Sequence, residues 1–254
     1  MDPLAWGAQL ALFLVALLAN LFSAFSGGGA GLIQLPALIF LGLPFGLALA
    51  THKVASVALG LGATLRYLRA DIIERSFALF ILGCGLPGVL LGASFILAVP
   101  DRLSRFALGI LTIGLGLYSW LNPGLGHRQG PRHRDRRGYF IGGAVLFLIG
   151  VLNGSLTSGT GLFVTLWLVA WFGLDYKRAV AYTLILVGLF WNACGALALG
   201  LQGAIQWGWL PALLLGAVMG GYLGAHLAIV KDNRLIKRAF ELLTLVVGIK
   251  LVLG

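Results

Sequence analysis

Acidic side chains are scarce in this sequence. Only eight of its 254 residues are Asp or Glu, and nearly all of them fall between apolar segments rather than within them. A carrier of cations, or a proton relay built on carboxylates, normally places acids near the middle of the bilayer. The shortage of acids therefore argues against the transport of metal ions, although a cation carrier stays open as an alternative.

Charge of either sign is also low, at 10% of residues, while 59% of residues are hydrophobic. Soluble domains average about a quarter charged and about half apolar, and none could hide so many apolar runs of about 20 residues. We therefore expect an integral membrane protein. Its net charge of +10 is explained by basic loops that orient the chain in the bilayer, and we expect no nucleic-acid partner.

Several catalytic and ligand-binding motifs are missing. The sequence has no P-loop lysine motif, no HExxH helix and no Cys/His cluster, so ATP-driven pumping and zinc proteolysis by this chain have no support. Its two cysteines, Cys84 and Cys194, both lie in apolar segments and are interpreted as packed free thiols. We expect no catalytic residues, no metal site, no cofactor and no enzymatic activity.

What the sequence does contain is a series of ten apolar segments. They cover residues 4–25, 32–43, 46–65, 76–98, 103–121, 138–153, 160–173, 178–200, 207–230 and 236–253. The second and seventh are too short to cross about 30 Å of hydrocarbon as straight helices. We expect them to be half-helices or re-entrant pieces. The predicted fold is an all-α polytopic membrane protein with about eight to ten membrane segments.

Two glycine-rich turns precede the two short segments, and they match each other. The first reads SGGGAGLI over 26–33 and the second TSGTGLF over 157–163. Glycine allows close approach and positive φ, so such turns can present bare backbone N–H groups. In a membrane, irregular backbone is tolerated only where protein buries it or where it lines a cavity. Matched helix breaks of this kind are typical of a transporter's binding site, although close packing of small residues is the alternative.

The two halves of the chain align around these turns. Gly29 and Gly31 lie over Gly159 and Gly161, 42–43 over 173–174, 48–50 over 179–181, 87–93 over 220–226, and Arg105 over Arg238. Each half has five segments, an odd number, so the second half must enter the membrane from the opposite side. We predict a first inverted repeat over 1–121, a basic cytoplasmic linker over 122–138 and a second inverted repeat over 139–254.

The distribution of cations predicts the orientation. Fourteen Lys and Arg residues, five of them in the stretch 128–137, fall on one side of the predicted membrane and four on the other. By the positive-inside rule the richer side is cytoplasmic, which leaves both termini outside the cell membrane. The basic linker could also contact anionic lipid headgroups.

Polar residues inside apolar segments are the remaining candidates for a site. Lys53 could balance the charge of an anion or could extend to the outer surface from a helix end. His52 could relay protons or be an ordinary interfacial histidine. Asn192 must face the protein interior, toward substrate or another helix. His226 is interpreted as a helix–helix hydrogen bond, and Glu241 as an ion pair with Arg238.

An anion held in a dry cavity needs fixed donors, which backbone amides at a helix N-terminus and nearby hydroxyls can supply. The predicted substrate-binding residues are Ser26, Gly27, Gly28, Gly29, Gly31, Thr51, His52, Lys53, Thr157, Ser158, Gly159, Thr160, Gly161, Tyr182, Thr183 and Asn192.

At these residues the chain resembles the TauE/SafE family of sulfite exporters, also called the sulfonate uptake permease family. The matching features are the two glycine turns, the Gly-Leu pairs at 42–43 and 173–174, and the pattern Ala-x-Ala-Thr-x-Lys over 48–53. The similarity extends over essentially the whole chain. It implies a bacterial or archaeal inner-membrane carrier for anions such as sulfite, sulfoacetate or related sulfonates.

The sequence thus predicts a secondary carrier that binds a small sulfur oxyanion between the glycine turns and works by alternating access. The alternatives are a non-transporting membrane scaffold, a membrane enzyme acting on lipid-embedded substrate, and a cation carrier. The sequence leaves the direction of transport, the coupling ion and the oligomeric state open, a homodimer included.

Overall fold

The computed structural model describes residues 6–68, 73–95, 101–123, 130–155, 159–201 and 205–253, and within these ranges every regular element is helical. The elements are α1 (Trp6–Ser26), α2 (Ala30–Phe40), α3 (Phe45–Tyr67), α4 (Arg75–Phe95), α5 (Asp101–Leu121), α6 (Arg136–Ser155), α7 (Thr160–Ala170), α8 (Tyr176–Tyr182), the π-helix η2 (Thr183–Trp191), α9 (Asn192–Gly200), the 3₁₀ turn η3 (Trp207–Trp209), α10 (Leu210–Val230) and α11 (Asn233–Leu253). The predicted all-α fold is confirmed across the described residues.

Among the described residues, six helical stretches are long and apolar enough to cross a membrane. They are Trp6–Ser26, Gly46–Tyr67, Arg75–Ser94, Arg136–Ser155, Tyr176–Gly200 and Trp207–Val230. Helices α2 and α7 are apolar but have only 11 residues each, which makes each about 16 Å long. Each therefore reaches about halfway through the hydrocarbon core, and the prediction of two short helices after the glycine turns is confirmed.

Glycine determines where both short helices begin. The residue before α2 is Gly29, with φ of 96°, and the residue before α7 is Gly159, with φ of 78°. A residue with a Cβ would be strained by about 1–2 kcal/mol in this left-handed conformation. Glycine at these two positions therefore allows each short helix to start directly after a left-handed residue.

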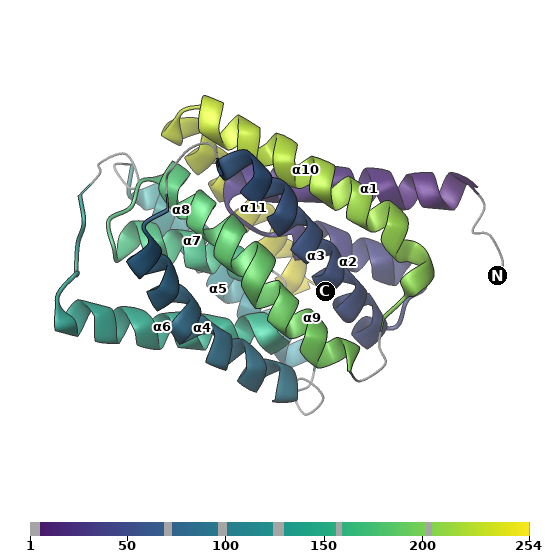
Figure 1. Ribbon diagram of the computed structural model, residues 1–254, viewed down its shortest axis with the longest axis horizontal. Helices are drawn as coiled ribbons and strands as arrows, with labels where there is room; N and C mark the ends of the chain where they lie inside the picture. The colour runs from purple at the N-terminus through teal and green to yellow at the C-terminus, as the bar shows by residue number, and fades with distance from the viewer. Residues whose placement is uncertain are drawn as a thin grey trace.

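The long helices pack in pairs taken from opposite halves of the sequence. Helix α1 packs along α10, and α4 packs along α6. Helix α3 contacts η2 and α9 as well as α10, and α5 packs against α11. In Figure 1, α1 and α10 form one edge of the molecule and α4 and α6 the opposite edge, with α3 and α9 between them. The segment η2 and the short helices lie among these pairs.

Small residues allow these pairs to approach closely. A Cβ added at Gly216, Gly220 or Gly224 of α10 would collide with backbone of α1, and one added at Gly88 or Gly92 of α4 would collide with backbone of α6. In lipid, helices gain little by hiding apolar surface from one another, so backbone-to-backbone contact of this kind stabilises the association. Many large apolar side chains face outward instead. On α1, for example, Leu10, Leu14, Leu18 and Phe22 are all exposed.

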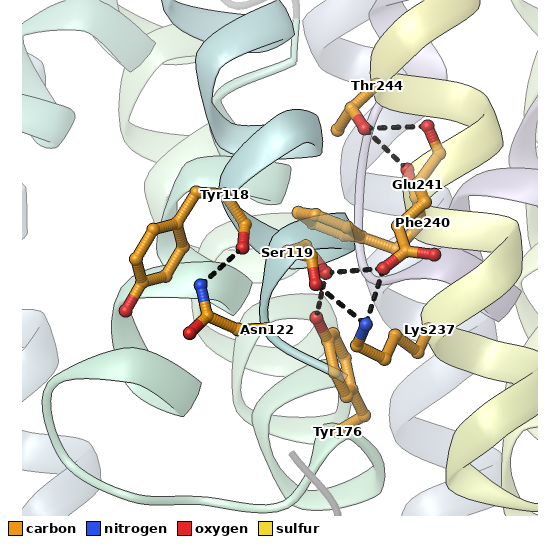
Figure 2. Close-up of polar contacts among 8 residues, drawn as sticks. All are labelled: Tyr118, Ser119, Asn122, Tyr176, Lys237, Phe240, Glu241 and Thr244. Carbon is orange, nitrogen blue, oxygen red and sulfur yellow. Dashed lines mark hydrogen bonds and ion pairs between the residues drawn. The ribbon is translucent and has the colours of Figure 1, made fainter. Parts of the chain in front are cut away.

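A buried polar network ties α5, α8 and α11 together (Figure 2). Lys237 Nζ lies 2.6 Å from Glu241 Oε1 and donates to the carbonyl of Ser119 at 2.7 Å. The Ser119 hydroxyl donates to Glu241 Oε1 at 3.0 Å and lies 2.9 Å from the hydroxyl of Tyr176. The prediction that Glu241 pairs with Arg238 is wrong. Lys237 takes that place because it faces α5, whereas Arg238 is exposed.

Two other sequence predictions can be checked in the helix packing. His226 on α10 accepts a hydrogen bond from Arg66 Nε on α3 at 3.0 Å, so its interpretation as a helix–helix hydrogen bond is confirmed. Cys84 and Cys194 are free thiols of intermediate burial, as expected.

Candidate functional site

The two glycine turns touch each other, backbone against backbone. A Cβ added at Gly28 would lie 2.6 Å from the carbonyl carbon of Gly161 and 2.6 Å from the nitrogen of Leu162. A Cβ at Gly161 would lie 3.0 Å from the Cα of Gly28. Turns separated by about 130 residues in the sequence therefore meet in the interior of the protein, and glycine is required for that contact.

Buried hydrogen bonds from both halves of the chain fix the first turn in place. The amides of Gly27 and Gly28 both donate to the carbonyl of Ser23, at 2.9 and 2.8 Å. From the other half of the chain, the Thr165 hydroxyl donates to the carbonyl of Gly27 at 2.6 Å, and its oxygen lies 2.8 Å from Thr183 Oγ1. Thr165 is fully buried, so the first turn is held by contacts from both halves.

Both short helices begin at this contact. The amides of Leu32 and Leu162 bond back to the carbonyls of Gly29 and Gly159. The amides of Ala30 and Gly161 have no hydrogen-bond partner among the described residues. Two helix N-termini, each carrying roughly half a positive charge, therefore point their first-turn N–H groups into the same region.

A cavity of about 40 Å³ lies where these N-termini meet. Eight of the predicted site residues line it, namely Gly28, Gly29, Gly31, His52, Thr160, Gly161, Thr183 and Asn192. Thr157 and Ser158 lie outside the described residues. The remaining six do not line the cavity, namely Ser26, Gly27, Thr51, Lys53, Gly159 and Tyr182.

Three of the residues outside the lining are engaged in other contacts. The Ser26 hydroxyl donates to the carbonyl of Phe22 at 2.8 Å, one helical turn back. Thr51 Oγ1 donates to the carbonyl of Leu47 and accepts from the amide of Gln206. The Tyr182 hydroxyl accepts from the amide of Glu74 at 2.7 Å, at the start of α4. Their side chains are thus occupied in holding helices and loops.

Lys53 lies behind the cavity wall and is completely buried. Its ammonium group donates to the backbone carbonyl of Asn153 at 2.8 Å and lies 3.4 Å from Asn153 Oδ1. The alternative in which Lys53 extends to the outer surface is wrong, because no part of its side chain reaches solvent. A lysine held by a carbonyl and an amide rather than a carboxylate keeps its charge uncompensated, which is costly inside a membrane protein.

Two polar side chains in the lining have an atom without a partner. Asn192 donates to the carbonyl of Gly188 at 3.4 Å, but its Oδ1 accepts no hydrogen bond among the described residues. His52 Nε2 lies 3.2 Å from Ser56 Oγ, and its Nδ1 has no partner there either. Buried polar atoms are normally hydrogen-bonded, so these two unpaired atoms are available to a ligand in the cavity.

Sequence reasoning missed three polar residues that line the cavity: Ser23, Ser56 and Asn153. Asn153 donates to Thr160 Oγ1 at 2.8 Å and so joins α6 to the start of α7. The offset of 130 residues that places Gly31 over Gly161 also places Ser23 over Asn153. Extending the repeat alignment back into the long helices would have found Ser23 and Asn153. Ser56 could have been found because it follows His52 by one helical turn and so lies on the same face of α3.

None of the described residues that line the cavity is acidic. Among the described residues, no group of three or more His, Cys, Asp or Glu side chains could hold a metal ion. The wall of the cavity also includes four residues of the π-helix η2, namely Thr183, Leu184, Val187 and Gly188. Wide turns of this kind occur often at functional sites because they redirect side chains and free backbone groups.

These features define a class of protein: a multi-pass helical membrane protein whose two broken helices meet at an internal polar cavity. The comparisons place it more narrowly. The profile of the family described as "Sulfite exporter TauE/SafE" matches residues 12–251. The chain belongs to this family, which is one of membrane transporters.

Relatives of known name agree with that membership. The chain is 30% identical to the probable membrane transporter protein YfcA of Escherichia coli over 252 residues, covering 98% of this chain and 90% of the relative. It is 29% identical to a probable membrane transporter protein of Haemophilus influenzae over 242 residues, covering 95% and 93%. Similarity to the probable membrane transporter protein YunE of Bacillus subtilis is lower, at 23% over 268 residues. No solved structure matches the chain.

Proposed function

We propose that this protein is a secondary carrier of small sulfur-containing anions, such as sulfite, sulfoacetate or related sulfonates, and that it has no enzymatic activity. The observation that carries the proposal is the meeting of two helix N-termini at a cavity whose described lining residues include no carboxylate. Backbone amides there are fixed donors that cannot leave with the ligand, and the helix dipoles favour negative charge. The buried amine of Lys53, which donates to the carbonyl of Asn153 just behind the wall, adds positive charge when it is protonated.

The packing of the helices supports an inverted repeat over 1–121 and 139–254, joined by the basic linker 122–138. The first helix of each half packs on the fourth helix of the other, as α1 on α10 and α4 on α6. Cavity residues also come in matched pairs, with Ser23 and Asn153 at one position and His52 and Thr183 at another. A pseudo-two-fold axis would let one repeat rock against the other, giving alternating access to the site.

We further propose that the protein lies in a bacterial or archaeal inner membrane with both termini outside the cytoplasm. The support is the distribution of Lys and Arg, of which fourteen fall on the side of the membrane that holds the linker and four on the other side. By the positive-inside rule the richer side is cytoplasmic. A reporter that fluoresces only in the cytoplasm is expected to be active when inserted in the linker at residue 127 and inactive when fused to either terminus. Fluorescence from a terminal fusion would overturn this orientation.

Transport by purified protein tests the proposed function. In proteoliposomes preloaded with unlabelled sulfite, uptake of labelled sulfite by counterflow is expected to exceed that of protein-free liposomes. External sulfoacetate, thiosulfate, sulfate and taurine, tested one at a time as competitors, rank the substrate class. A carrier that moves none of these anions, and whose thermal stability responds to none of them, would contradict the assignment. Stabilisation by metal ions alone would favour a cation carrier instead.

A further inference from the structure

The lining of the cavity offers hydrogen-bond acceptors as well as donors. Asn192 is 7% exposed, and its amide nitrogen donates to the carbonyl of Gly188. Its Oδ1 is a carbonyl oxygen, which can only accept, and it has no partner among the described residues. A fully deprotonated oxyanion carries lone pairs on every oxygen and cannot satisfy such an atom. This orphan acceptor is therefore unexplained by a site that provides donors alone.

His52 supplies a second acceptor by the same reasoning. The Ser56 hydroxyl donates its hydrogen to the backbone carbonyl of His52 at 2.9 Å. The contact of 3.2 Å between Ser56 Oγ and His52 Nε2 therefore requires the imidazole to donate from Nε2. In the neutral ring this leaves Nδ1 as a bare acceptor. His52 is 1% exposed, and its Nδ1 has no partner within the described ranges.

We propose that the cavity selects an oxyanion that still carries one proton, such as hydrogen sulfite, over oxyanions and sulfonates that carry none. This inference rests on the proposed function and specifies its substrate. The N–H groups of Ala30 and Gly161 bind the charged oxygens, and the acidic hydroxyl of the ligand donates to Asn192 Oδ1. The helix N-termini and this orphan acceptor are then completed by one ligand, while His52 Nδ1 is left as a second acceptor in the same lining.

The size of the cavity agrees with a compact ligand of this kind. A buried water needs a volume of roughly 10–15 Å³ on the same measure, so a cavity of about 40 Å³ holds about three water-sized atoms. That matches the three oxygens of one pyramidal head group. A sulfonate must fit its carbon substituent into the same space, and it has no proton to donate.

The predicted selectivity follows from the cost of leaving an acceptor unpaired. Burying one polar group without its hydrogen bond weakens binding by a factor of about five to a hundred. We expect the protonated monoanion to bind at least about fivefold more tightly than a sulfonate with the same head group and the same charge.

The proposal is tested by measuring the binding of sulfite and of methanesulfonate to the wild-type protein by calorimetry in detergent. Each anion is measured at one pH below and one pH above the second ionisation of sulfurous acid. The affinity for total sulfite is expected to rise at the lower pH, in proportion to the fraction of hydrogen sulfite, while the affinity for methanesulfonate stays nearly constant. Methanesulfonate is the control for titration of the protein itself. The ionisable side chains at or behind the cavity are His52 and Lys53 on α3 and Cys194 on α9; the lining contributed by α1, α2, α6, α7 and η2 has none.

A pair of variants separates the acceptor from general effects on folding. Asn192→Leu removes the orphan acceptor, and we expect it to abolish the preference for sulfite at low pH. Asn20 is a matched control because its Oδ1 is also buried and unpaired but lies outside the cavity lining. Asn20→Leu should keep the preference.

The outcomes distinguish the two levels of the proposal. Equal pH responses for sulfite and methanesulfonate, or a preference that survives in Asn192→Leu, would overturn the selection of a protonated anion while leaving anion transport intact. If neither anion binds at any pH, the proposed function itself fails. The wild-type comparison decides the question even if Asn192→Leu does not fold.

Discussion

Gly28→Ala is expected to reduce anion uptake by at least tenfold. The new Cβ would lie 2.6 Å from backbone atoms of Gly161 and Leu162, well inside van der Waals contact, and backbone cannot rotate out of the way as a side chain can. The two turns would have to separate, and the N–H groups of α2 and α7 would no longer converge. Because catalysts and carriers depend on donors held in fixed positions, a shift of about 1 Å can cost about a hundredfold in rate. The measurement is the initial uptake rate per reconstituted protein.

Gly42→Ala is the matched control for this variant. Gly42 also has a positive φ, of 101°, but an added Cβ meets nothing within 4 Å. It therefore introduces a backbone strain of about 1–3 kcal/mol without a collision. We expect a lower melting temperature and near-normal uptake. Equal loss of uptake in both variants would show that backbone strain, rather than contact between the turns, is responsible.

The short helices could be predicted because their signals are local. A run of apolar residues too short for the bilayer, preceded by several glycines, is visible in the sequence at 26–40 and again at 157–170. The meeting of the turns followed from their matching positions in two repeats. Neither inference required knowledge of which side chains would be neighbours in the folded protein.

The direction of single polar side chains could not be predicted in the same way. Ser26 and Ser23 lie three residues apart at the end of α1, yet only Ser23 lines the cavity. The Ser26 hydroxyl bonds to its own helix instead, a local alternative always open to serine. The choice depends on the rotation of α1 against α10, which is set by glycine contacts between distant segments.

The partners of charged residues likewise depend on tertiary structure. Lys237 and Arg238 are both within reach of Glu241 along one helix, and the choice of Lys237 depends on the carbonyl of Ser119 on α5. Lys53 is buried because Asn153, a hundred residues later, supplies its hydrogen bonds. The π-helical geometry of η2 also has no clear signal in its sequence, which reads as an ordinary apolar helix.

Lys53→Met is expected to raise the Kd for the anion by about thirtyfold while leaving the fold intact. At an effective dielectric constant of about 20, a cation about 8 Å from an anion stabilises it by about 2 kcal/mol, which gives that factor. Removing the charge leaves the carbonyl of Asn153 without its donor, at a cost of about 1–3 kcal/mol. It also removes a desolvation penalty of several kcal/mol. The two effects on folding oppose each other, so binding should change more than stability.

Lys237→Met is the control that reverses this pattern. Lys237 is also buried, but its partner is the carboxylate of Glu241, and its loss leaves an uncompensated charge in the interior at a cost of about 3–5 kcal/mol. We expect a large fall in melting temperature with an unchanged Kd in the protein that remains folded. Adding Glu241→Leu should restore most of the stability, because the unpaired carboxylate is then removed as well. If Lys53→Met instead behaves like Lys237→Met, with lost stability and normal affinity, then Lys53 serves only to anchor α3 to Asn153 of α6 and contributes no charge to the site.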